Sequence, residues 1–362
     1  MAPQRICSSC VLPGTPRLSL DEQGVCALCR SPRRLQHIRK ESDRAGLDRL
    51  VEQARRRGRG APHDCVVAWS GGRDSTFMLH ELVVAHRLRC VAVFGRTPFT
   101  PPETVASVRA IAARLGVELV QLDTPPNHAA VAGYCVRQYL RTRAPILINL
   151  ACAPCKFVNR ELFRQAARLG VRTIVYGGNR FEYFPAGPAS VDIDAEDRYS
   201  PANMLRDSAL RLARGCAVLI SCPPLVRHLP TLFAASVLYV NQYTPFLRLR
   251  YPGIVRFDYF HYADWDEARI AAVLRELGWT LPAGCTSSWR ADCVFEAVKN
   301  AVFSEQVGFS YLQALYSNLI RAGKLTRAEA LQRLAVEGVS EPRLRTALRL
   351  CGLPEDAIAV RP

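Results

Sequence analysis

Residues 65–83 read CVVAWSGGRDSTFMLHELV. The first five residues are apolar and mostly β-favouring, the middle is SGGRDS, and the last part repeats apolar residues at helical spacing. This order predicts a strand, a tight loop and a helix. A loop in that position commonly binds an anion, because free backbone N–H groups and the positive end of the helix dipole face it.

Strand and helix patterns alternate along the following hundred residues. The pattern predicts strands at 64–69, 89–95, 117–123 and 173–179, and helices at 74–86, 101–116, 127–141 and 155–169. Such alternation implies right-handed crossovers and an α/β fold, with a mostly parallel sheet and helices on both faces. Ligands bind such sheets at the carboxyl ends of the strands, where SGGRDS falls.

Length and composition set the broad class. A chain of 362 residues with 49% hydrophobic content is expected to fold into two or three domains. No apolar run approaches the roughly 18 residues that span a bilayer, and MAPQRICSSC lacks the apolar core of a signal peptide. We therefore expect a cytoplasmic protein without a membrane partner.

The formal net charge of +16 suits a polyanionic partner, for example tRNA. However, only four of the 48 basic residues are Lys, so an overall preference for Arg explains the charge equally well. The densest run, RRRGR at 55–59, also suits a solvated linker, and residues 34–57 are expected to form a surface helix.

Four of the fourteen cysteines have the spacing of a metal site. Cys7, Cys10, Cys26 and Cys29 form C-x2-C-x15-C-x2-C, which predicts a structural Zn²⁺ ribbon with four thiolate ligands. A ribbon this small buries little apolar surface, so the metal would supply much of its folding energy. Cys65, Cys90 and Cys135 lie inside predicted elements and are expected to be core residues.

SGGRDS has the chemistry of a phosphate cradle. Gly71 and Gly72 let the backbone approach an oxyanion, and Ser70 and Ser75 can donate hydroxyl hydrogen bonds. The loop matches neither the Walker motif nor the dinucleotide fingerprint. A plain strand-to-helix turn is the alternative interpretation.

Asp74 favours a nucleotide. A carboxylate among phosphate-binding groups is unfavourable unless a cation bridges it to the phosphates, so Asp74 indicates Mg²⁺ with a nucleotide. At this point the sequence resembles the PP-loop ATP pyrophosphatases, whose signature is SGGxDS after the first strand. The resemblance implies that the loop binds ATP, that a substrate oxygen attacks the α-phosphate, and that pyrophosphate leaves. Arg73 stands where that family usually has Lys, and we expect it to be catalytic.

Other segments extend the resemblance. Gly177, Gly178 and Asn179, followed by Glu182, lie where these enzymes have a second nucleotide-binding turn. The segments CSSCVLPGTPRLSLDEQGVCALC, SSWRADC and LIRAGKLTRAEAL resemble those of N-acetyl sugar amidotransferases. That resemblance implies a sugar as the small-molecule substrate, and ammonia supplied by a separate glutaminase.

The chain is thus expected to have four parts. These are a zinc ribbon at 1–32, a basic helical linker at 33–63, a PP-loop nucleotide-binding domain at 64–260, and a mainly helical region at 261–362. In the last part, Thr326 and Glu329 have capping-box spacing.

After pyrophosphate leaves, the substrate oxygen carries AMP, and a nucleophile must displace that AMP. The sequence leaves open whether this nucleophile is nitrogen or sulfur. Ammonia would give an amidine or amide, whereas a persulfide or bound sulfide would give a thionated product. Cys152 and Cys155 form a C-x-x-C pair that can carry a persulfide, and Cys222 is a candidate third thiol. Resemblance to thiolating relatives implies that these three hold an iron–sulfur cluster, which would require a sulfur-donor protein. We favour nitrogen.

Two further alternatives stay open. Arg290 in SSWRADC is a candidate for binding a phosphate or carboxylate, or else Ser288 caps a helix with Asp292 in its first turn. The whole chain could also be a non-catalytic nucleic-acid-binding protein with a zinc ribbon. The intact Ser70, Asp74 and Ser75 argue against that interpretation.

Overall fold

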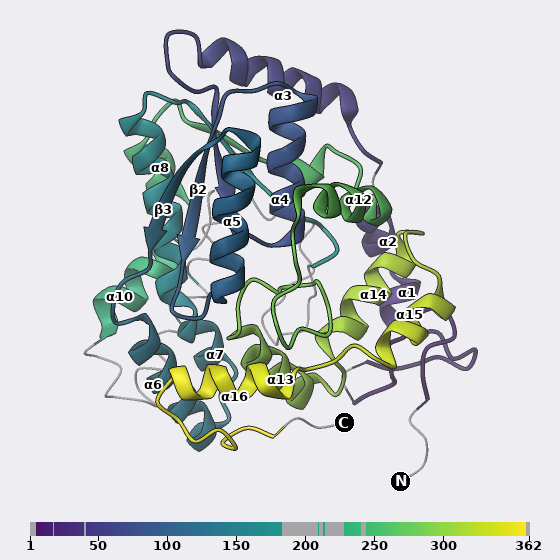
Figure 1. The fold of residues 1–362 in the computed structure, drawn as a ribbon. Coiled ribbons are helices and arrows are strands. Elements are labelled where there is room, and N and C mark those ends of the chain that lie inside the picture. Colours follow the sequence, from purple (N-terminus) through teal and green to yellow (C-terminus); the bar gives the residue numbers. More distant parts are fainter. Residues whose placement is uncertain are drawn as a thin grey trace.

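The computed structural model describes residues 5–16, 18–39, 41–182, 209, 213, 228–239 and 244–359. Its centre is a five-stranded, all-parallel sheet in the order β3-β2-β1-β4-β5 (Figure 1). The predicted α/β class is confirmed. The strands are β1 (Cys65–Trp69), β2 (Cys90–Arg96), β3 (Glu118–Asp123), β4 (Thr173–Tyr176) and β5 (Val255–Asp258).

Helices cover both faces of the sheet (Figure 1). On one face lie α4 (Arg73–His80), continued by a π-helical turn (Glu81–Ala85), α5 (Pro102–Leu115) and α12 (Glu267–Leu277). On the other lies α8 (Phe157–Arg168). The short elements α10 (Leu229–Phe233), a second π-helical turn (Ala234–Leu238), α11 (Pro245–Arg250) and a 3-10 turn (Tyr259–His261) flank β4 and β5 in sequence.

Strand β1 is apolar throughout because both of its sides are buried. Val67 and Trp69 belong to the core beneath α4, whereas Val66 packs in the core beneath α8. Parallel strands buried on both faces read as continuous apolar runs, as CVVAW does. Strand β5 was not predicted, because VRFD alternates apolar and charged residues over only four positions. Cys65, Cys90 and Cys135 are buried core residues, as expected.

Two further helical groups lie at the carboxyl ends of the strands (Figure 1). One contains α6 (His128–Thr142), α7 (Ile146–Ala151), a 3-10 turn (Ala153–Lys156), α13 (Glu296–Val307) and α16 (Glu341–Leu350). The other contains α14 (Tyr311–Arg321) and α15 (Arg327–Leu334), which lie beside the N-terminal segment and α1 (Ala27–Arg30). The predicted capping box of Thr326 and Glu329 is present at α15.

The single helix predicted for 34–57 is wrong. The chain forms α2 (Pro32–Ile38) and α3 (Arg44–Arg57) with a break between them. Asp43 causes the restart, because its side chain accepts a hydrogen bond from Gly46 N and caps α3.

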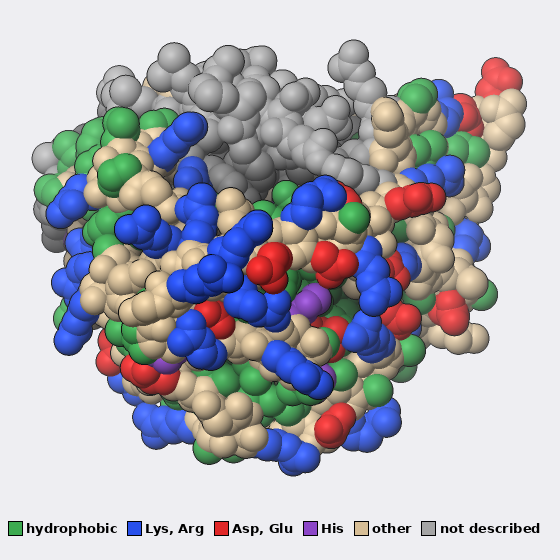
Figure 2. All heavy atoms as spheres, turned by 90° about the horizontal axis from the view of Figure 1, so that it is seen from above, with side chains coloured by type: hydrophobic (Ala, Val, Ile, Leu, Met, Phe, Trp, Pro, Cys, Tyr) green, Lys and Arg blue, Asp and Glu red, His purple; other side chains and the backbone are tan. Residues whose placement is uncertain are grey.

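Figure 2 shows how basic side chains are placed on one face of the molecule. On the face seen from above, Lys and Arg lie among acidic and apolar groups (Figure 2). Some are paired, as Arg55 is with Glu52 and Arg89 with Asp64. In the described ranges, no helix has the length and apolar character needed to cross a membrane.

The close contact between α6 and the residue that follows α16 can be tested by its effect on the stability of the protein. A Cβ on Gly133 would lie 2.0 Å from the carbonyl oxygen of Cys351, which is backbone and cannot rotate away. We expect Gly133→Ala to lower the free energy of unfolding by about 1–3 kcal/mol, although Ala is the better helix former. Gly338→Ala is the control, because a Cβ there meets nothing within 4 Å. Equal urea midpoints for the two variants would contradict the packing.

Candidate active site

The loop after β1 lies at the carboxyl end of the sheet. At Gly71, this loop has no room for a side chain. Gly71 has φ +82°, and a Cβ there would lie 2.7 Å from Thr104 Cγ2 and 2.9 Å from Val108 Cγ2. Both the conformation and the close approach of α5 therefore require glycine.

Hydroxyl groups close this loop over the first turn of α4. Ser70 Oγ and Ser75 Oγ lie 3.1 Å apart, and Ser70 Oγ accepts a hydrogen bond from Gly72 N (3.2 Å). Ser75 Oγ also lies 3.1 Å from the Gly72 carbonyl, to which it can donate. The arrangement places two hydroxyls and the N-terminus of α4 around one short turn, which suits a phosphate.

Asp74 is held in one orientation by hydrogen bonds to one of its two carboxylate oxygens. Its side chain is buried, and its Oδ2 accepts from Asn179 Nδ2 (2.6 Å) and Trp265 Nε1 (3.3 Å). Among the described residues, its Oδ1 accepts no hydrogen bond, although Arg73 Nε lies 3.2 Å away. A buried carboxylate oxygen with spare lone pairs is a suitable ligand for Mg²⁺.

A second carboxylate lies against the same loop. A Cβ on Gly72 would be 3.3 Å from Cγ of Asp292, so this carboxyl packs on the loop backbone. Two carboxylates beside a turn that suits a phosphate would fit a divalent cation better than a bare anion.

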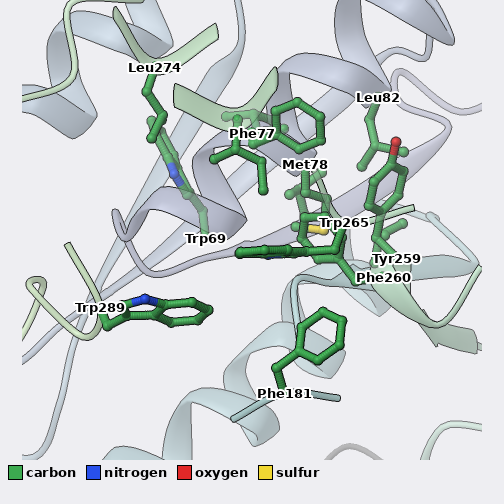
Figure 3. Close-up of a cluster of buried hydrophobic side chains, with 14 of the residues drawn as sticks. Trp69, Phe77, Met78, Leu82, Phe181, Tyr259, Phe260, Trp265, Leu274 and Trp289 are labelled. Carbon is green, nitrogen blue, oxygen red and sulfur yellow. The ribbon is translucent and has the colours of Figure 1, made fainter. Parts of the chain in front are cut away.

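Arg73 points into an aromatic cage. Its guanidinium lies 3.5 Å from the ring centroid of Trp289 and 5.2 Å from that of Trp265. It also donates from Nη1 to Glu267 Oε1 (3.1 Å) and Ser288 Oγ (3.0 Å). The two indole rings lie nearly parallel, with Phe181 beside Trp265 (Figure 3). Arg73 thus fastens the loop to the segment before α13, and its predicted catalytic role stays a prediction.

The two predicted nucleotide-binding turns meet. A Cβ on Gly177 would lie 3.1 Å from Ser75 Cα, and one on Gly178 would lie 2.8 Å from Asp258 Oδ1. Gly177 therefore allows the turn after β4 to approach the first turn of α4, and Gly178 allows the same turn to approach the end of β5. The approach brings Asn179 to the carboxylate of Asp74.

Glu182 and Arg290 form an ion pair next to this turn. Burial raises the pKa of Glu182, while the positive charge of Arg290 and the negative charge of Asp74 act on it in opposite directions. The alternative in which Ser288 caps a helix is wrong, because the next helix, α13, begins at Glu296. Arg290 instead has φ 53° and directs its side chain to Glu182.

The C-x-x-C pair lies in a neighbouring buried region. Cys152 ends α7, and Cys155 Sγ lies 3.6 Å from Nε2 of His128. Burial raises the pKa of Cys155 to about 12 and lowers that of His128 to about 4. Near pH 7 the pair is therefore a thiol beside a neutral imidazole rather than a thiolate–imidazolium pair. Cys222 lies outside the described residues.

Cys293 is a third thiol in this region that the sequence did not indicate. Burial raises its pKa strongly, and its proximity to Cys155 and Cys152 adds to the effect. Its position far along the chain from the C-x-x-C pair gave no spacing signal. Lys156 and Lys299 also act electrostatically on Cys152 and Cys155.

The predicted metal ligands come together. The sulfur atoms of Cys7, Cys10, Cys26 and Cys29 all lie within 4.8 Å of one another. The Arg321 guanidinium, only 4% exposed as a residue, donates to Cys29 Sγ (3.2 Å) and Cys10 Sγ (3.3 Å).

This buried cation fits a loaded cluster. Four thiolates around one divalent ion carry two net negative charges, which Arg321 partly compensates. Beside four neutral thiols its own charge would be buried without a counter-charge, which is unfavourable. The residues present therefore fit a tetrahedral metal site.

No protein-family model matches this chain, and no curated protein matches it. Similar solved structures include an NMN synthetase from Francisella tularensis, which is 12% identical. The match covers 82% of this chain and 92% of the synthetase chain, with a TM-score of 0.38. A U34-tRNA thiolase, NcsA from Methanococcus maripaludis with its 4Fe-4S cluster, has 13% identity, 87% and 88% coverage, and TM-score 0.33. An NH3-dependent NAD synthetase from Campylobacter jejuni has 14% identity, 55% and 93% coverage, and TM-score 0.28. All three likenesses are distant.

The cysteine cluster predicts one tightly bound Zn²⁺ per chain. Replacing Cys7 or Cys26 by Ser removes one of four ligands, so each variant should lose the metal and become protease-sensitive before residue 40. Metal analysis and limited proteolysis measure both effects. Cys90→Ser is the control, since this buried cysteine lies in β2, away from the cluster. Full zinc retention in both ribbon variants would contradict the site.

Proposed function

We propose that this chain is a PP-loop ATP pyrophosphatase that adenylates a carbonyl or amide oxygen and then replaces it with nitrogen. The observation that carries the proposal is the contact between two glycine-rich turns, in which Asn179 holds Asp74 beside the Ser70–Ser75 loop. The PP-loop signature SGGxDS supports ATP as the nucleotide, and the amidotransferase-like segments support an N-acetyl sugar as the acceptor.

The proposed first step is attack of the substrate oxygen on the α-phosphorus of ATP. The bond between the α-phosphorus and the bridging oxygen breaks, and pyrophosphate leaves with that electron pair. Ser70, Ser75 and the N-terminus of α4 would hold the leaving pyrophosphate. Mg²⁺, when bound at Asp74, would neutralise phosphate charge.

In the second step ammonia adds to the activated carbon, and AMP leaves with the substrate's original oxygen. An amide acceptor becomes an amidine, and the ammonia nitrogen gives up protons to solvent or to a base. The amidotransferase-like segments support nitrogen over sulfur, and the high pKa of Cys155 disfavours direct attack by this thiol, because a protonated thiol is a poor nucleophile. A separate glutaminase would supply the ammonia.

Sulfur transfer is the second candidate function. The observation that favours it is Cys293, which lies close enough to Cys152 and Cys155 for these two thiols to raise its pKa, in addition to the effect of burial. Three thiols in one buried region have the donor chemistry to hold an iron–sulfur cluster. A thiolated product, on tRNA or on a small molecule, would require a sulfur-donor protein.

Asp74→Asn tests the nucleotide chemistry. The amide is isosteric but cannot bind Mg²⁺ as a carboxylate does, so Mg²⁺-dependent pyrophosphate release should fall at least about 100-fold. Asp123→Asn is the matched control, since this exposed carboxylate at the end of β3 pairs with Arg96. Product analysis should show AMP; release of ADP would show that a different bond is cleaved.

Cys152→Ser and Cys155→Ser separate nitrogen from sulfur chemistry. With ammonium salts, both variants should keep turnover within about threefold of the wild type, because the PP-loop is untouched and ammonia needs no thiol. Visible absorbance and labile sulfide are measured on anaerobically purified protein. A cluster absorbance that disappears in either variant, together with lost product formation, would support sulfur transfer instead.

A further inference from the structure

Helix α14 carries two buried polar side chains one turn apart, Asn318 and Arg321, at 0% and 4% exposure. Besides its bonds to Cys29 and Cys10, Arg321 donates from Nη1 to Asn318 Oδ1 (3.0 Å). Asn318 in turn donates from Nδ2 to the carbonyl oxygen of Phe181 (2.8 Å). The cysteine cluster is thereby joined to the turn after β4.

The same series of bonds reaches Asp74. The backbone N–H groups of Phe181 and Glu182 donate to Asn179 Oδ1 at 2.9 and 3.0 Å. These two bonds fix the amide orientation, so that Asn179 Nδ2 faces Asp74 Oδ2 at 2.6 Å. The carbonyl of Phe181 is thus held by Asn318 while its N–H sets the direction of Asn179.

We propose that Asn318 and Arg321 are positioning residues that couple the metal-loaded cysteine cluster to the nucleotide site. In this mechanism, the loaded cluster strengthens the orientation of Asp74 through Asn179, in addition to the hydrogen bond from Trp265 Nε1. The inference rests on the proposed function, because it assigns Asp74 to the metal that accompanies ATP.

The physical basis is geometric. A bound ion holds the four sulfur atoms at the corners of a tetrahedron, and Arg321 can then contact Cys10 and Cys29 together. Without the ion nothing fixes the distances between the sulfur atoms, and in the proposed coupling Arg321 then no longer contacts Cys10 and Cys29 together. Arg321 then no longer presents Nη1 to Asn318, and the Phe181 carbonyl loses a fixed donor.

Ser317 provides a matched control on the same helix. Its Oγ accepts a hydrogen bond from Val11 N (3.3 Å) in the cysteine ribbon, and it is fully buried. It therefore joins α14 to the ribbon as Arg321 does, but it lies outside the bonds that lead through Asn318 to Asn179.

The experiment measures Mn²⁺ affinity in the presence of α,β-methylene-ATP by electron paramagnetic resonance, on full-length protein, without turnover. Asn318→Asp keeps the shape and the acceptor for Arg321 but lacks the donor to Phe181. We expect this variant to keep one zinc per chain and to bind Mn²⁺ about tenfold more weakly, while Ser317→Ala binds like the wild type. Arg321→Lys keeps the charge without the planar fork and should behave like Asn318→Asp.

Zinc removal supplies the second arm. Zinc is removed with dipicolinate, and the protein is returned to chelator-free buffer. The wild type should then bind Mn²⁺ about tenfold more weakly, whereas Asn318→Asp, already weakened, should lose little further Mn²⁺ affinity. The reason is that zinc removal and the substitution break the same series of bonds. If zinc removal and Asn318→Asp each lowered Mn²⁺ affinity and their factors multiplied in the stripped variant, the coupling would be overturned. Wild-type Mn²⁺ affinity in zinc-loaded Asn318→Asp and Arg321→Lys would also overturn it. Zinc-loaded wild type that binds no Mn²⁺ with nucleotide would overturn the proposed function itself.

Discussion

The hydrogen bond from Asn179 to Asp74 is the contact on which the arrangement of this molecule depends. It joins the turn after β4 to the first turn of α4, where Gly177 leaves room for the backbone of Ser75 and Gly178 leaves room for the side chain of Asp258. Around it, the chain brings in Trp265 from the segment before α12 and Phe181 from the turn after β4. The sheet and the C-terminal region thus converge on one carboxylate.

The sequence predicted those parts of the fold that depend on local patterns. Apolar runs and helical periodicity located four of the five strands and the helices α4, α5, α6 and α8, whereas β5 was missed because VRFD is short and half charged. Cysteine spacing predicted the cluster, since its four ligands lie in two C-x2-C pairs within 23 residues of sequence from Cys7 to Cys29. In each case the determining residues are neighbours in the chain.

Long-range contacts of the candidate site could not be predicted in this way. Trp289 and Glu267 contact Arg73, and Asn318 contacts Phe181. These residues are so far apart in the sequence that no periodicity or spacing indicates the contacts. Arg290 shows the same limit, because SSWRADC has the composition of a helix start, yet its left-handed backbone turns the side chain to Glu182. Tertiary partners, which one sequence does not display, decide these conformations.

The aromatic surroundings of the loop have an optical consequence. The chain has four tryptophans, and each contacts the same short region: Trp69 donates to Thr76 and Trp279 donates to the Gly71 carbonyl, while Trp265 and Trp289 flank Arg73. Indole emission responds to nearby charge and to water. The intrinsic fluorescence of the whole protein is therefore a built-in reporter of a single turn of backbone, with no distant tryptophan to dilute the signal.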